Sequence, residues 1–141
     1  MQYKGQLAAI GPEIVKKALG RQTPADVGEF IRKHFIHGMR EGERLCFDLE
    51  NSAPNWGEYV SDGTFTLDFF NWQWLNTHDN YMPYVRDNEN AGLGGQNPGH
   101  YIRSQDFVMI MRCGAENEES LGEVISQIPN FTTDFQHVVI S

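Results

Sequence analysis

Apolar residues recur at helical spacing twice within the first 42 residues. Gly11–Gly20 predicts a short helix, because Pro12 suits a first helical turn and Gly20 suits a stop. A second helix is expected from Thr23, whose side chain can cap it, to Gly42. Residues at helical spacing along this segment predict one apolar face, made of Val27, Phe30, Ile31, His34, Phe35 and Gly38.

Apolar runs of strand length follow the two helices. Arg44–Leu49 comes directly after the second helix, and a helix that turns tightly into an apolar strand is typical of parallel α/β units. Phe107–Met111 is a continuous apolar run, which predicts a central strand buried on both faces. Glu118–Ile128 carries a helical stripe, and Phe135–Ile140 predicts a last strand. The pattern predicts a single α/β domain over residues 1–141, with a parallel sheet flanked by helices.

The stretch 52–105 follows neither periodicity. It holds most of the large aromatic side chains, set among Asn, Asp and Gly. Thr64–Phe70 alternates as a strand would, and Ala91–Gly99 predicts a loop. A connection of this length inside one domain is usually functional or disordered. We therefore expect a long, irregular, aromatic and Gly-rich insert that becomes ordered on a partner.

Composition narrows the function classes. A formal net charge of -8 argues against nucleic acid and against an anionic membrane surface, since both need a basic face, and it leaves a basic partner compatible. No apolar run approaches the ~20 residues of a membrane-spanning helix, and the N-terminus lacks the apolar core of a secretion signal. Cys46 and Cys113 both lie in apolar strands, so we expect reduced, buried thiols and a cytoplasmic protein.

Two carboxylates, Asp48 and Glu50, close the Arg44–Leu49 strand. If the strand continues through them, their side chains share one side, at the sheet edge where α/β domains bind ligands. There they could hold Mg²⁺ and orient water, or they could simply accept hydrogen bonds from loop backbone. The chain has no G-x-x-x-x-G-K-[ST] loop, which favours the second interpretation. Of the histidines only His34 and His37 have a suggestive spacing, so we expect neither metal nor cofactor.

Several short blocks together resemble the fifth AAA+ module of dynein heavy chains. They are a helix ending in Gly, an apolar strand closing on Asp-x-Glu-Asn, an Asp-Phe pair leading into an apolar strand and Arg, a Glu-Val pair and an Asn-Phe-Thr triplet. In this chain they are Phe35–Gly42, Phe47–Asn51, Asp106–Arg112, Glu123–Val124 and Asn130–Thr132. The family's Thr after the buried strand is absent, since Cys113 follows Arg112. A similar degenerate module occurs in ankyrin- and IQ-motif-bearing ciliary proteins.

The resemblance implies a partial P-loop-NTPase-like sheet with an architectural role. It implies no enzymatic activity, and a structural or docking component of a large, microtubule-associated assembly such as the axoneme of the cilium or flagellum. Asp48 and Glu50 would then be a vestigial nucleotide or metal site. The alternative is a nucleotide-dependent hydrolase whose missing loop comes from a partner chain.

Aromatic side chains in the insert are the candidate partner-binding residues. If Phe69–Trp74 forms a strand, Trp72 and Trp74 place two indoles on one face, a platform for a partner's side chains or for a sugar ring. The plain alternative is that these rings belong to the core. The candidate partner-binding residues are Trp56, Trp72, Trp74 and Tyr81, and we expect the three tryptophans to gain burial on assembly.

Overall fold

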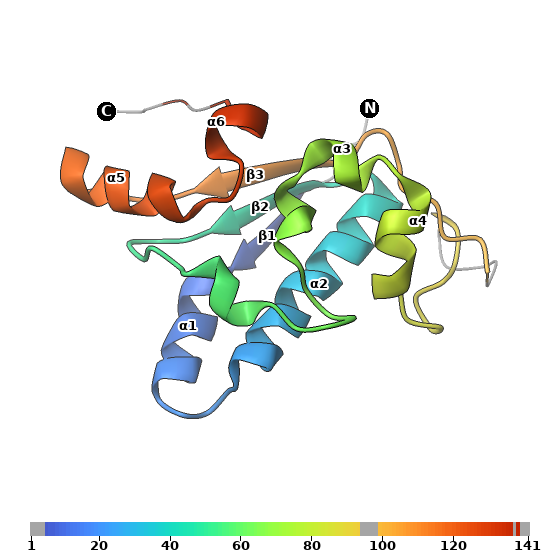
Figure 1. The fold of residues 1–141 in the computed structure, drawn as a ribbon, viewed down its shortest axis with the longest axis horizontal. Coiled ribbons are helices and arrows are strands. Elements are labelled where there is room, and N and C mark those ends of the chain that lie inside the picture. Colours follow the sequence, from blue (N-terminus) through green and yellow to red (C-terminus); the bar gives the residue numbers. More distant parts are fainter. Residues whose placement is uncertain (1–4, 94–98, 137, 139–141) are drawn as a thin grey trace.

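The computed structural model describes residues 5–93, 99–136 and 138, and it combines helices with a parallel sheet (Figure 1). Three strands, β1, β2 and β3, occupy Gly5–Ala9, Arg44–Asp48 and Val108–Arg112. The α-helices are α1 (Ile10–Ala18), α2 (Pro24–Glu41), α3 (Trp72–Leu75), α4 (His78–Tyr81), α5 (Glu118–Gln127) and α6 (Phe131–Asp134). The 3-10 helices η1, η2 and η3 occupy Trp56–Tyr59, Leu67–Phe70 and Met82–Tyr84.

The described sheet has the strand order β1-β2-β3, and both pairs are parallel. The predicted α/β class with a parallel sheet and flanking helices is therefore confirmed. The prediction that Phe107–Met111 forms a central strand buried on both faces is wrong, because β3 is an edge strand of the described sheet and β2 is central. Strand β1 was not expected, because Gly5–Ala9 offers one large apolar side chain, Leu7, and no β-branched residue.

Helix α2 follows the sequence prediction closely. The Thr23 hydroxyl accepts a hydrogen bond from the Asp26 N–H, and the Asp26 carboxylate accepts one from the Thr23 N–H, which completes a capping box. Gly42 ends the helix in the left-handed conformation, with φ 68°. This defined end lets the chain enter β2 after a single intervening residue.

One core lies between α2 and the sheet. Phe35 of α2 is fully buried and has ring centroids of Phe47, Phe69 and Phe107 within 5.1–6.1 Å. Two of these partners, Phe47 and Phe107, come from the region of the sheet, and Phe69 comes from the insert. Val124 of α5 is buried in the same cluster. Helices and insert therefore share one core on one face of the sheet.

The insert forms a layer of short turns along α2 (Figure 1). Trp56, Tyr59, Phe65, Phe70 and Tyr101 are at most 2% exposed, so its aromatic residues complete the core. The predicted strand over Thr64–Phe70 is wrong. Only an isolated antiparallel bridge joins Ser61 and Phe65, and the Thr66 side chain then caps a 3-10 turn. The loop expected over Ala91–Gly99 lies partly outside the described residues.

The C-terminal segment returns to the insert after β3. Helix α5 was predicted and is confirmed, with the Asn117 side chain as its N-cap. Helix α6 was not predicted, and its Asp134 carboxylate accepts a hydrogen bond from the Trp72 N–H at 3.2 Å. The strand expected over Phe135–Ile140 lies largely outside the described residues, and Phe135 and Gln136 adopt no regular structure.

Candidate functional site

The carboxyl ends of the strands are where an open α/β sheet holds a ligand, so we begin there. Strand β1 ends at Ala9 and α1 begins at Ile10, so no loop separates the first strand from its helix. A Cβ added to Gly11 would lie 2.7 Å from Oε2 of Glu50, so this carboxylate packs against the first turn of α1. The positive end of a helix attracts an anion, and here the neighbouring anion is the chain's own side chain.

Asp48 and Glu50 do not share one face of a strand, as the sequence had suggested. Strand β2 ends at Asp48, and Glu50 lies in a turn with φ 52°. Asp48 accepts the Glu50 N–H at 3.0 Å through Oδ1 and Arg112 Nη1 at 3.2 Å through Oδ2. Asp48 therefore ties the ends of β2 and β3 together. Within residues 5–93, 99–136 and 138, no three His, Cys, Asp or Glu side chains cluster as metal ligands would.

The four predicted aromatic contact residues differ in how deeply they are buried. Trp56 is 1% exposed and Tyr81 is 3% exposed, so both side chains lie in the core. Trp74 is half-buried against Phe69 and Tyr84. Trp72 is 38% exposed and is the most exposed of the four.

The prediction that Trp72 and Trp74 form a platform of two indoles on one face is wrong. Trp72 and Trp74 lie two residues apart on the short helix α3 rather than on a strand, so their side chains diverge. The Trp72 ring stacks on Phe107, with centroids 6.3 Å apart and planes at 11°, while Trp74 packs on different neighbours. The proline-free run Phe69–Trp74 gave no strong helix signal, and the Asn71 side chain, which caps α3, was the cue that the sequence offered.

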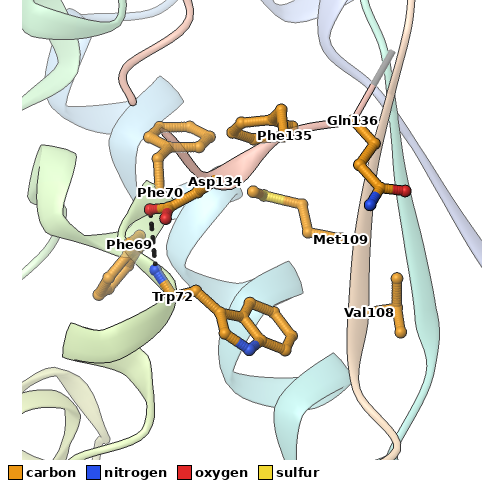
Figure 2. Close-up of a pocket in the computed structure, with 8 residues that line it drawn as sticks. All are labelled: Phe69, Phe70, Trp72, Val108, Met109, Asp134, Phe135 and Gln136. Atoms are coloured by element: carbon orange, nitrogen blue, oxygen red, sulfur yellow. Dashed lines mark hydrogen bonds between the residues drawn. The ribbon is translucent and has the colours of Figure 1, made fainter. Parts of the chain in front are cut away.

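A shallow groove of about 340 Å³ opens beside Trp72 (Figure 2). Figure 2 shows the side chains of Trp72 and Met109 around the groove, with Phe135 and Gln136 of the C-terminal segment on its other side. The hydrogen bond from the Trp72 N–H to Asp134 ties the insert to α6 at this point. The groove is therefore a junction of three chain segments at the edge strand β3.

The open face of the sheet is the largest feature that sequence reasoning missed. Strand residues alternate, and the side that meets α2 is buried, as at Leu45 and Phe47. On the opposite side Leu7 pairs in register with Cys46, and Cys46 with Ile110. Leu7 is 60% exposed and Ile110 is 40% exposed, with Val108 open beside them at 43%. These four residues, Leu7, Cys46, Val108 and Ile110, form what we call the open face.

The open face is uncharged at its centre. Cys46 is a free, half-buried thiol rather than a buried one as expected, and Cys113 is also half-buried and free. Burial, with a smaller contribution from the charge of Asp48, raises the pKa of the Cys46 thiol, so it stays protonated near neutral pH. The row from Leu7 to Ile110 is therefore apolar across all three strands.

Known proteins give no further guide to this arrangement. Within the described part of the chain, no helix has the length and apolarity needed to cross a bilayer. Comparison with protein-family models, with curated proteins and with solved structures finds no match.

Proposed function

We propose that this chain is a non-catalytic docking component of a larger assembly, and that the open face is its contact surface. The observation that supports this most directly is the exposed apolar row Leu7–Cys46–Ile110 on a parallel sheet. Parallel sheets in soluble proteins are covered on both faces, because their strands are apolar on both sides. A bare apolar face of this kind is a typical contact surface.

The partner that fits this surface is one amphipathic helix of another protein. Strands lie about 4.8 Å apart, so three strands present a face about 10 Å wide. A helix with its side chains has a diameter of about 10–12 Å, so a single helix spans the row. The chain carries a formal net charge of -8, which leaves a basic partner compatible.

The non-catalytic part of the proposal draws on the strand ends. The direct connection of β1 to α1 and the position of Glu50 against Gly11 leave little room for a phosphate at that helix. Asp48 is engaged by Arg112 and by the Glu50 backbone. The proposal therefore includes a degenerate, P-loop-NTPase-like sheet. It also includes the axoneme as the setting, and that part is supported by the dynein-like sequence blocks alone.

A photo-crosslinking amino acid placed at single positions tests the docking surface. Introduced at Ile110 in cells that make the protein, it should yield one discrete crosslinked species, and mass spectrometry of that species should find the crosslinked residue on an amphipathic helix. The same group at Leu19, which is 63% exposed on the helical side, is the matched control. Equal crosslinking from Leu19 and Ile110, or crosslinks to copies of this chain alone, would contradict a partner helix on the open face.

Isothermal titration with ATP and Mg²⁺ tests the alternative of a nucleotide-dependent hydrolase. We expect no binding heat for the wild type and none for Asp48→Ala. Saturable binding that Asp48→Ala abolishes would favour the hydrolase alternative and would leave the docking experiment unaffected.

A further inference from the structure

Strand β3 uses one of its two edges to bond to β2. At its start the Val108 N–H donates to the Glu43 carbonyl at 3.1 Å, and at its end the Arg112 carbonyl accepts from the Leu49 N–H at 2.8 Å. Both residues have register partners on β2. Along a strand in a parallel ladder, successive residues direct their N–H and C=O to opposite edges. Every second residue of β3, counted from Val108, therefore faces β2.

Met109 and Met111 are the residues between these positions. Their N–H and C=O groups point away from β2, toward what we call the free edge of β3. Within residues 5–93, 99–136 and 138, no hydrogen bond joins these four groups to a neighbour. The two residues lie about 6.6 Å apart along the strand, which is the repeat of another extended chain. The free edge is therefore a template for strand pairing.

The groove beside Trp72 lies next to the free edge (Figure 2). Met109 lines it from β3, and Phe135 lines it from the C-terminal segment. Its volume of about 340 Å³ is at the lower end for binding pockets, so it suits a single apolar side chain. The wall at Trp72 is held in place, because its ring stacks on Phe107 and the buried Arg103 guanidinium carbon lies 4.7 Å from its centroid.

The groove also has a charge that an occupant must match. Among the described residues that line it, Asp134 is the only charged one. Asp134 is exposed, and its Oδ2 accepts the Trp72 N–H at 3.2 Å, so the carboxylate remains open to a cation. The whole chain has a formal net charge of -8. Charge complementarity at this groove therefore favours a cationic side chain beside the apolar one.

We propose that the free edge of β3 pairs with an extended segment of a partner protein. The segment places one apolar side chain in the groove, and a lysine or arginine two positions away, on the same face of the segment, meets Asp134. Hydrogen bonds with Met109 and Met111 supply the affinity, and the groove selects the sequence. This contact uses the edge of β3, so it is separate from the helix proposed for the open face and succeeds or fails without it.

Hydrogen exchange of the isolated chain tests whether the free edge is open. The amides of Met109 and Met111 should exchange at least about tenfold faster than that of Ile110, because the Ile110 N–H faces β2. Equal protection of all three amides would mean that the edge is already covered and would overturn the proposal. Protection that appears only at high protein concentration would show that a second copy occupies the edge, which would also overturn it.

A short capped peptide tests the pairing. Its central phenylalanine is flanked on each side by a valine and then by a lysine, so that the phenylalanine and both lysines share one face. In ¹⁵N spectra the Met109 and Met111 amide signals should shift saturably, with a Kd in the high micromolar to millimolar range. The same peptide with all its backbone amides methylated keeps every side chain and should bind at least about tenfold more weakly. Equal binding of the two peptides, or no shift, would overturn strand pairing.

A charge-removing variant tests the position of the segment. Asp134→Asn keeps an oxygen that accepts the Trp72 N–H, and it should weaken binding of the lysine peptide by about two- to fivefold at low salt. A peptide with glutamine in place of both lysines should bind wild type and Asp134→Asn equally. Asp79→Asn, which changes a fully exposed carboxylate on α4, is the matched control. If Asp134→Asn binds the lysine peptide as tightly as wild type does, the proposed seat in the groove is wrong.

Discussion

At the scale of single residues, Arg32 carries the densest set of polar contacts in the core. It is 1% exposed, and its Nη1 donates to Glu89 at 2.6 Å and to the Tyr84 carbonyl at 2.8 Å. Its other edge holds Glu29. Burial alone lowers the pKa of the Arg32 guanidinium, but the hydrogen bonds with Glu29 and Glu89 outweigh it and raise the pKa overall. Arg32 therefore joins α2 to the far end of the insert.

Replacing Arg32 should destabilise the protein strongly. Arg32→Leu leaves two carboxylates without their cation and should lower the free energy of unfolding by about 3 kcal/mol, the lower end of the range for a broken buried pair. Arg86→Gln is the control, since Arg86 is exposed, and should change stability by less than about 0.5 kcal/mol. Urea unfolding followed by circular dichroism measures both, and equal effects would contradict the role given to Arg32.

Glu29 should make part of this stability depend on pH. The hydrogen bond from Arg32 holds the pKa of Glu29 below its usual range, against a smaller opposing effect of burial. A lowered pKa means that the stabilisation is present above the unfolded-state pKa of about 4.3 and is lost as the pH falls through the folded-state pKa. The difference in urea midpoint between wild type and Glu29→Gln should therefore be largest at neutral pH and shrink in acid. A difference that does not vary with pH would refute this.

At the scale of elements, the packing of α2 against η1 depends on Gly28. A Cβ at this position would lie 2.5 Å from the Tyr59 carbonyl oxygen, which belongs to the backbone and cannot turn away. Gly122 of α5 is the matched case, because a Cβ there meets nothing within 4 Å. Substitutions at these two glycines therefore distinguish the effect of close backbone packing from the effect of helix propensity.

Alanine should have opposite effects at these two positions. Gly28→Ala should destabilise the protein by about 1–2 kcal/mol, because the clash outweighs the gain in helix propensity. Gly122→Ala should stabilise it by about 0.5–1 kcal/mol, since α5 gains propensity without a clash. Thermal unfolding of both variants under one set of conditions gives the comparison, and stabilisation by Gly28→Ala would show that η1 does not press on α2.

Elements whose apolar residues recur at a clear helical period were predictable from the sequence, and the short turns of the insert were not. Helix α2 was found with its cap and its end because Thr23 and Gly42 mark them and Phe35 lies on a regular apolar face. The insert was mispredicted because alternation at Phe65 and Phe69 has the appearance of a strand, while Thr66 and Asn71 cap short turns instead. Such turns are stabilised by tertiary packing of their rings, which sequence periodicity does not contain.

At the scale of the whole molecule, the open face should bind a hydrophobic dye in the isolated chain. The double variant Leu7→Ser with Ile110→Ser should reduce the fluorescence of bound 1-anilinonaphthalene-8-sulfonate. Each substitution should change stability by less than about 1 kcal/mol, because Leu7 is 60% and Ile110 40% exposed. Leu19→Ser with Val60→Ser is the control at 63% and 48% exposure. Severe destabilisation of the first double variant alone would mean that the face is already covered.

The candidate sites illustrate what a sequence leaves out at this scale. The apolar run of β3 was found, but whether its second face is covered depends on where other elements lie. The buried Arg103 gave no signal in the sequence, because the lack of an acceptor for its Nε and Nη2 among the described residues is a property of the folded neighbourhood. Asp48 was placed correctly at the end of β2, whereas Glu50 left the strand because the chain turns there.

The strand order has a further consequence for how such a molecule could grow. Right-handed crossovers that always step the same way, from β1 to β2 to β3, deliver every helix to one side. Appending more strand–helix units beyond β3 would widen the bare side instead of closing it. A right-handed unit that added its strand beside β1 would reverse the direction of the strand order and would place its helix over the bare side.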